Sequence, residues 1–210
     1  MMNEYIEKLE KEFSKIANGY KDIEKRAVDD YKLESKEFIS SLSKLAYKSD
    51  IHQVRMYAVF LLGYLSGDKE ILNFMKEDVS KDDNWKVQEI LAKSFDQFCK
   101  TKRYEESLTT IDEWLNDENL NTRRAVTEGL RIWTTRPFFK DNPEEAIRRL
   151  SKLKRDSSEY VRKSVGNALR DISKKFPELI KQELKSWELD TKEIKQVYRL
   201  ASKFIEKTGE

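Results

Sequence analysis

The sequence predicts an all-α fold in which HEAT-like helical hairpins repeat along the chain and stack into a curved superhelix. Strong helix formers fill nearly every stretch, and only 3 Pro and 6 Gly interrupt the 210 residues. Apolar residues recur with the period of a helix, and one core pattern returns at intervals typical of a solenoid. No alternating strand pattern competes with this interpretation.

Helices are expected wherever the helical period persists, and they follow one another along the whole chain. The predicted helices cover residues 3–17, 20–30, 36–48, 51–65, 68–79, 84–99, 105–116, 121–134, 143–154, 158–174, 177–186 and 191–206. Pro143 follows Asp141 and Asn142, which together indicate a helix start with proline at the first helical position, and Pro177 is placed in the same way.

Four of these helices share one pattern of core residues. Aligned on one anchor each, at Val54, Val87, Thr122 and Val161, they are spaced by 33, 35 and 39 residues. The positions four residues later are Ala58, Leu91, Val126 and Val165, and those eight residues later are Leu62, Phe95, Leu130 and Leu169. Because each hairpin buries its apolar face only against its neighbours, we expect a single domain over residues 1–210, with capping helices at about 1–48 and repeats at about 49–206.

The composition excludes several classes of site. A single cysteine, Cys99, cannot form an internal disulfide and indicates a reducing compartment, and no apolar run is long enough to span a bilayer. The chain has one histidine, His52, and none of the phosphate-loop, dinucleotide, zinc-protease or serine-hydrolase motifs. We therefore expect a cytoplasmic protein without a metal or a small-molecule cofactor, with His52 at the surface or as a cap and Cys99 buried.

The net charge of +2 conceals an uneven distribution along the chain. Residues 1–118 carry a net charge of −6, residues 119–175 carry +8, and residues 176–210 are balanced. Residues 119–175, which we call the basic block, favour a polyanionic partner, because a clustered positive field acts at short range on closely spaced phosphates. The alternative is an ordinary solvated helical surface.

A second stripe on the aligned helices carries acidic residues. Glu89 lies two residues past its anchor, Glu128 six and Asp171 ten, so each step moves one helical turn along the same face. Basic and aromatic residues on the same or adjoining stripes are Arg123, Arg124, Arg131, Arg162, Lys163, Arg170 and Trp85. We expect three carboxylates on one wall within a basic surface. The alternative is that these acids only neutralise neighbouring arginines in surface ion pairs, which stabilise little.

Three segments contain specific sequence motifs in addition to the helical period. They read WKVQE at 85–89, NTRRAVTEGLR at 121–131 and EYVRKSVGNALRDISKKFP at 159–177. They resemble the DNA alkylation repair family, most closely the AlkC-type branch of its HEAT-like alkylpurine DNA glycosylases, whose motifs run as W-x-x-x-[DE], V-R-R-x-x-S-E-G-x-R and V-R-x-S-V-x-N-x-L-x-D-I-x-K-x-x-P. One departure concerns Trp133, which falls a few residues earlier than the tryptophan of the AlkC-type pattern.

The resemblance implies a monomer that excises N3- and N7-alkylated purines from double-stranded DNA, with Glu89, Glu128 and Asp171 as the acidic active-site residues. An alkylated purine already carries positive charge and leaves readily, so the chemical demand is to stabilise the positive charge that moves onto the deoxyribose. A nearby carboxylate does this and orients the attacking water. An aromatic face at Trp85 or Trp133 would add cation–π attraction. The six basic residues of the stripes would hold phosphates.

Two other interpretations stay open. A HEAT-like module of the same family could bind DNA or a protein without excising a base, and a salt-sensitive DNA complex without base release would favour it. A pure protein scaffold would expose residues 119–175 as a solvated face, and absence of DNA binding at low salt would favour that interpretation.

Overall fold

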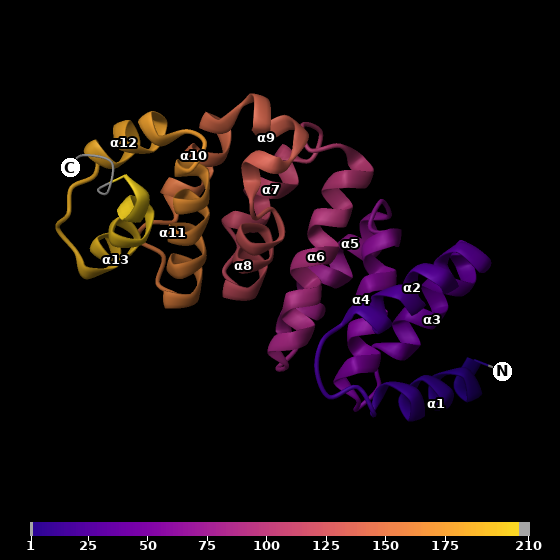
Figure 1. Cartoon of the computed structure of the whole chain (residues 1–210). Helices are drawn as coiled ribbons and strands as arrows, with labels where there is room; N and C mark the ends of the chain where they lie inside the picture. Colours follow the sequence, from indigo (N-terminus) through magenta and orange to yellow (C-terminus); the bar gives the residue numbers. More distant parts are fainter. Residues whose placement is uncertain (1, 206–210) are drawn as a thin grey trace. The chain divides into compact units, whose positions relative to one another are not determined.

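The computed structural model describes residues 2–205 and is all-helical over that range (Figure 1). The predicted fold class is therefore confirmed. The chain divides into two compact units, unit 1 with residues 1–102 and unit 2 with residues 103–210. The expectation of a single continuous domain stays a prediction.

The helices follow closely on one another in both units. Unit 1 contains α1 (Met2–Phe13), α2 (Lys21–Leu33), α3 (Lys36–Ala46), α4 (His52–Leu65), α5 (Lys69–Glu77), a 3-10 turn (Val79–Lys81) and α6 (Trp85–Lys102). Unit 2 contains α7 (Leu108–Leu115), α8 (Leu120–Gly129), a 3-10 turn (Trp133–Thr135), α9 (Pro137–Asp141), α10 (Pro143–Lys152), α11 (Glu159–Ser173), α12 (Pro177–Lys185), α13 (Lys192–Ala201) and a 3-10 turn (Ser202–Phe204). Pro143 and Pro177 begin α10 and α12, as predicted.

The apolar stripe of the four aligned helices forms the core. These helices are α4, α6, α8 and α11, and the aligned anchor, fourth and eighth positions on them are all 0% exposed, from Val54 to Leu169. Within unit 1, α4 packs against α6, and within unit 2, α11 contacts both α8 and α13 (Figure 1). Burying a large apolar side chain stabilises the fold by roughly 1.5–3 kcal/mol, so this stripe supplies much of the driving force for folding.

Two glycines allow neighbouring helices to approach closely. A Cβ atom on Gly63 of α4 would lie 2.8 Å from the Cβ of Ser94 on α6, and one on Gly166 of α11 would lie 2.7 Å from the Cβ of Leu200 on α13. Ser94 in turn donates its hydroxyl to the carbonyl of Val59 at 2.8 Å. The close packing therefore accounts for glycine inside two helices, where it costs about 1 kcal/mol relative to alanine.

A polar ladder connects the aligned helices to the loops before them. Each aligned helix carries an arginine or glutamine six residues after a loop residue; the pairs are Ser49 and Arg55, Asp82 and Gln88, Asp117 and Arg123, and Asp156 and Arg162. In every pair the later side chain donates to the main-chain carbonyl of the earlier residue. Arg55 also binds both carboxylate oxygens of Asp82, at 2.8 and 3.2 Å. The ladder fixes each loop and, at Arg55, ties one repeat to the next.

The helix predicted over residues 121–134 ends earlier than expected. It stops at Gly129, and a 3-10 turn and α9 follow. Pro137 begins α9 and disfavours a helical conformation at Arg136, which is extended with φ −82° and ψ 138°. The Nη2 group of Arg136 donates to the carbonyls of Gly129 and Arg131, at 3.0 and 3.2 Å, and so satisfies main-chain groups that the end of a helix leaves open.

Candidate functional site

Asp171 lies near the C-terminal end of α11 and is the most buried of the three predicted acids, with a side chain that is 5% exposed. Its Oδ2 accepts a hydrogen bond from Nε of Arg131 at 2.9 Å. Its Oδ1 lies 3.3 Å from Nζ of Lys174 and 3.7 Å from Nη2 of Arg170. Three cations therefore converge on one carboxylate.

Glu128, in the last turn of α8, joins this group through Arg131. Its Oε2 lies 3.6 Å from Nη1 of Arg131, and its side chain is 27% exposed. Arg131 thus contacts both predicted acids of unit 2. We call Glu128, Arg131, Arg170, Asp171 and Lys174 the unit 2 cluster; its three cations outnumber its two carboxylates.

The surroundings of Asp171 keep it ionised. Burial alone would raise the pKa of Asp171, but hydrogen bonds from Arg131 and Lys174 and the charges of Arg131 and Arg170 outweigh that effect, so the pKa lies below its ordinary value. Burial likewise opposes the charge of Arg131, yet its hydrogen bond to Asp171 prevails and the pKa of Arg131 is raised. At neutral pH the two residues form a carboxylate–guanidinium pair.

Lys174 is a member of the cluster that the acidic stripe does not predict. It follows the end of α11, and its Nζ also lies 5.2 Å from the centroid of the Phe204 ring. Its position three residues after Asp171 is the signal in the sequence that could have identified it, because residues three apart are neighbours on a helix surface.

Glu89 belongs to unit 1 and lies on an exposed face of α6. One turn before it, Trp85 begins the helix and is 62% exposed. Nζ of Lys86 lies 5.9 Å from the centroid of the Trp85 ring. Because Glu128 and Asp171 belong to unit 2, the expectation that all three acids share one wall stays a prediction.

Arg123 and Arg162 lie inside unit 2, with residue exposures of 8% and 9%. Nε and Nη2 of Arg123 bind the carboxylate of Asp156, at 2.7 and 2.9 Å. Arg162 donates through Nε to Gln196 at 2.8 Å, and through Nη1 to the carbonyls of Asp156 and Ser157. The prediction that these two arginines hold phosphates is therefore corrected, because their guanidinium groups are buried and occupied within the polar ladder.

Trp133 is also buried, at 0% exposure. Its ring lies edge-on to that of Phe139 with centroids 4.9 Å apart, and its indole N–H donates to the carbonyl of Thr127 at 3.4 Å. Because α8 ends at Gly129, Trp133 does not continue the helix face that the sequence predicts. The prediction of Trp133 as an aromatic surface for DNA is corrected, since it is a core residue of unit 2.

The other predicted basic residues differ in exposure. Arg124 is partly exposed on α8. Lys163 is exposed on α11 and pairs with Glu159 at 2.7 Å. The side chain of Arg170 is only 20% exposed, and its Nε is buried without a hydrogen-bond partner among residues 2–205. Of the predicted phosphate contacts, Arg124, Arg131 and Lys163 are therefore the ones that present charge at the surface.

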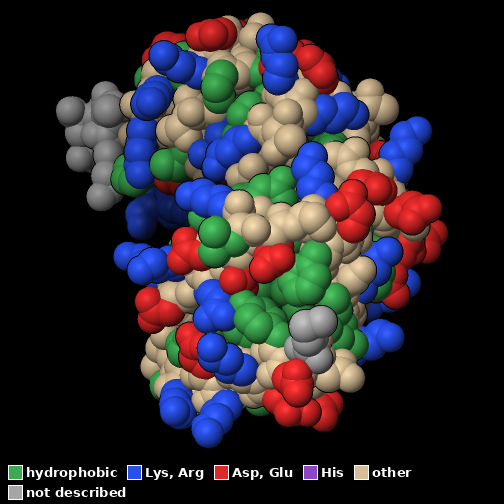
Figure 2. Space-filling view, turned by 90° about the vertical axis from the view of Figure 1, so that its right-hand side faces the viewer, with side chains coloured by type: hydrophobic (Ala, Val, Ile, Leu, Met, Phe, Trp, Pro, Cys, Tyr) green, Lys and Arg blue, Asp and Glu red, His purple; other side chains and the backbone are tan. Residues whose placement is uncertain are grey.

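The positive charge of the basic block is partly compensated in three dimensions. Arg149 pairs with Asp112 at 2.8 Å and Arg155 with Asp190 at 2.9 Å, so acids from outside residues 119–175 reach into the block. Figure 2 shows the side on which Figure 1 draws α1 to α3, outside the basic block, and basic and acidic side chains are interspersed there as well. The field outside the block is consequently weaker than its net charge suggests.

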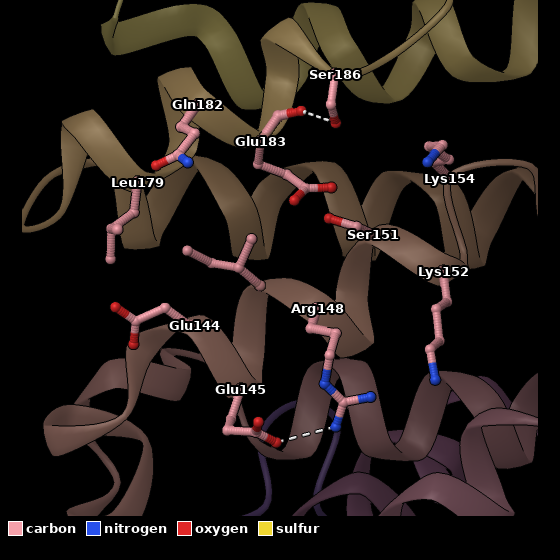
Figure 3. A pocket seen from close by; sticks show the side chains of 11 residues that line it. Glu144, Glu145, Arg148, Ser151, Lys152, Lys154, Leu179, Gln182, Glu183 and Ser186 are labelled. Atoms are coloured by element: carbon pink, nitrogen blue, oxygen red, sulfur yellow. Dashed lines mark hydrogen bonds and ion pairs between the residues drawn. The ribbon is translucent and has the colours of Figure 1, made fainter.

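A groove in unit 2 lies apart from the predicted residues, between α10 and α12 (Figure 3). Its lining includes three acidic and three basic side chains, and Arg148 pairs there with Glu145 at 2.9 Å. Within the part of the chain that the structure describes, the Oγ of Ser151 is buried at this groove without a hydrogen-bond partner. Because its charges balance, the groove offers no net attraction to phosphates.

The remaining candidate side chains do not form a metal site. Within residues 2–205, no group of three or more His, Cys, Asp and Glu side chains is placed to hold a metal ion. His52 begins α4 and is partly buried, and this burial lowers its pKa. Cys99 is buried, as predicted. In the same range, the helices lack the length and apolar character that crossing a bilayer requires.

Comparison with solved structures shows two informative similarities. The structure is similar to that of AlkD2 from Streptococcus mutans, with a TM-score of 0.96 and 66% identity, over 97% of this chain and 99% of that one. It is also similar to the Pseudomonas fluorescens alkylpurine DNA glycosylase AlkC bound to DNA containing an abasic site analog, with a TM-score of 0.65 and 25% identity, over 83% of this chain and 48% of that one.

Comparison by sequence agrees with the structural similarity. The uncharacterized protein YhaZ of Bacillus subtilis (strain 168) is 37% identical over 87 residues, which cover 40% of this chain and 24% of that protein. This chain thus matches only about a quarter of the length of YhaZ. The family model described as DNA alkylation repair enzyme matches residues 16–203. The chain therefore belongs to the DNA alkylation repair enzyme family.

Proposed function

We propose that this protein is a DNA glycosylase that hydrolyses the N-glycosidic bond of cationic N3- or N7-alkylated purines in double-stranded DNA. The observation that carries the proposal is Asp171, an ionised and almost buried carboxylate within a basic cluster, on a segment that resembles a family motif. We further expect the protein to act as a cytoplasmic monomer without a cofactor.

The reaction moves charge in a way that a fixed carboxylate assists. When the bond between C1′ of the deoxyribose and the purine nitrogen breaks, its electron pair goes to the base, which becomes neutral, and positive charge develops on the sugar. Asp171 would stabilise that charge, and the effect is strong because its site is shielded from water. Water then adds to C1′ and gives up a proton, for which the partly exposed Glu128 is the proposed acceptor. The products are the free base and an abasic site.

DNA binding is assigned to the surface residues of the stripes. Arg124, Arg131 and Lys163 are the proposed phosphate contacts, which fix the position of the duplex without reading its sequence. Trp85 offers an exposed aromatic face to a cationic purine, next to Glu89 on α6.

Release of 3-methyladenine and 7-methylguanine from methylated duplex DNA tests this function. The wild type should release at least one of them, and Asp171→Asn should lower the rate on the order of 10²-fold, because it removes a charge that stabilises the transition state. Asp141→Asn is the matched control, since Asp141 is an exposed carboxylate at the end of α9 in the same unit. A wild type that binds methylated duplex and releases neither base contradicts the proposal.

A second function, DNA binding without excision, is favoured by one specific observation. Asp171 is already neutralised by Arg131 and Lys174, and a carboxylate in that state stabilises a new positive charge less well. A salt-sensitive complex with duplex DNA, combined with no release of any N3- or N7-alkylated purine, would support this second function.

A further inference from the structure

Arg131 is the residue that joins the two acids of the unit 2 cluster. Its Nε donates to Asp171 at 2.9 Å and its Nη1 lies 3.6 Å from Glu128. The side chain of Arg131 is 31% exposed, so part of it is accessible from solvent. One guanidinium therefore contacts both carboxylates and is still partly accessible from solvent.

In this arrangement the cluster attracts an anion more than a cation. Its three cations outnumber its two carboxylates. A sugar that gains positive charge would be repelled by the guanidinium that neutralises Asp171, whereas a DNA phosphate would be attracted. Asp171 must therefore lose a cationic partner before it can stabilise the sugar.

Arg131 is the partner that a phosphate can withdraw most easily. Arg170 and Lys174 stand within three residues of Asp171 at the end of the same helix, so they stay near its carboxylate even though the side chain of Lys174 is 53% exposed. Arg131 instead comes from the chain after α8. A guanidinium binds phosphate through a fork of N–H donors, and because the Arg131 side chain is 31% exposed, a phosphate can reach it from solvent.

We propose that Arg131 is a phosphate-operated clamp: a phosphate of bound DNA takes the Arg131 guanidinium away from Asp171 and so frees this carboxylate only when DNA is present. Arg131 is then a positioning residue that acts through Asp171. The inference rests on the proposed function. It adds that DNA binding itself frees the Asp171 carboxylate to stabilise positive charge on the sugar.

The pKa of the Asp171 carboxyl group reports the state of the clamp. It can be followed by NMR in protein with 13C-labelled aspartate, alone and with an excess of undamaged duplex at low salt. Duplex binding should raise the pKa of Asp171 in the wild type, because its hydrogen-bonded partner moves to a phosphate. In Arg131→Gln the pKa should already be higher without DNA, and duplex binding should then raise it by less than about half of the wild-type rise.

Two further variants keep this test specific. Arg124→Gln, the matched control on α8, should weaken duplex binding as Arg131→Gln does, each reducing the slope of log K against log salt by about 1. Arg124→Gln should nevertheless show the same rise in the pKa of Asp171 as the wild type when duplex is bound. Arg131→Lys retains the positive charge and should retain a rise with DNA, which separates loss of the clamp from loss of the fold.

Several outcomes would overturn the clamp. A wild-type pKa of Asp171 that does not change when duplex binds means that Arg131 stays in place. An equal rise in Arg131→Gln means that the field of the phosphates alone causes it. Because this readout needs no base release, a normal response without excision would reject the glycosylase and retain the clamp, whereas absence of duplex binding would reject both.

Discussion

Trp85 and Trp133 are two candidate site residues with opposite surroundings. Trp85 is 62% exposed at the start of α6, and Trp133 is 0% exposed against Phe139. The sequence could not separate them, because apolar periodicity continues past Gly129 and predicts a longer helix than the one that forms. Trp133 lies beyond the end of α8 at Gly129, whose carbonyl accepts a hydrogen bond from Arg136, so its burial does not follow from the helical period.

Truncating each tryptophan to alanine should affect a different property, the stability of the fold for Trp133 and DNA binding for Trp85. Trp133→Ala should lower the free energy of unfolding by about 3–5 kcal/mol, because it leaves a cavity in the core of unit 2. Trp85→Ala should change that free energy by less than about 0.5 kcal/mol and should weaken binding to duplex that contains an alkylated purine. Denaturant unfolding and fluorescence anisotropy measure the two effects, and similar destabilisation by both variants would contradict the assignment.

Asp171 should make the stability of the fold depend on pH. Its pKa in the folded protein is lowered, against about 3.9 for an unfolded chain. The stabilisation is therefore fully present above that value and is lost as the pH falls through the folded pKa. The difference in unfolding free energy between the wild type and Asp171→Asn should be constant near neutral pH and shrink below about pH 4. Denaturant unfolding at a series of pH values measures it, and a difference that does not shrink below about pH 4 would contradict the lowered pKa.

Helices and their cores follow from local patterns, whereas several side-chain roles do not. The buried stripe from Val54 to Leu169 could be predicted because a helical period is a local property of the sequence. The ladder is local too: the spacing of six residues between Asp117 and Arg123 identifies a structural arginine. The acidic stripe does not predict ion-pair partners, because such pairs form between residues about 40 positions apart, as Arg131 and Asp171 do.

Arg123 and Arg124 are adjacent on α8 and test the ladder as an element of the fold. Arg123→Ala should destabilise the protein by about 3 kcal/mol, because it leaves the Asp156 carboxylate, which is 4% exposed, without its partner. Arg124→Ala should change stability by less than about 0.5 kcal/mol. Denaturant unfolding measures both changes. Among molecules that are still folded, Arg124→Ala should weaken duplex binding more than Arg123→Ala does, measured in the same buffer. Equal stability of the two variants would remove the structural assignment of Arg123.

At the scale of the whole molecule, the number of charges that reach DNA differs from the number in the sequence. The basic block contains 15 Lys and Arg residues, but many of them are occupied by acids, as in the Arg155–Asp190 pair at 2.9 Å. Net charge counted along a chain therefore overestimates the field available for a polyanion, because folding brings acids from other segments into the block.

The salt dependence of duplex binding measures that field. If all 15 cations of the basic block met phosphates, log K against log salt would have a slope of about −13; contacts from Arg124, Arg131 and Lys163 alone give about −3. We expect a slope near the smaller value, measured by titrating labelled duplex over a series of salt concentrations. A slope steeper than about −8 would mean that internal ion pairs open when DNA binds, and it would extend the interface from three side chains to the whole block.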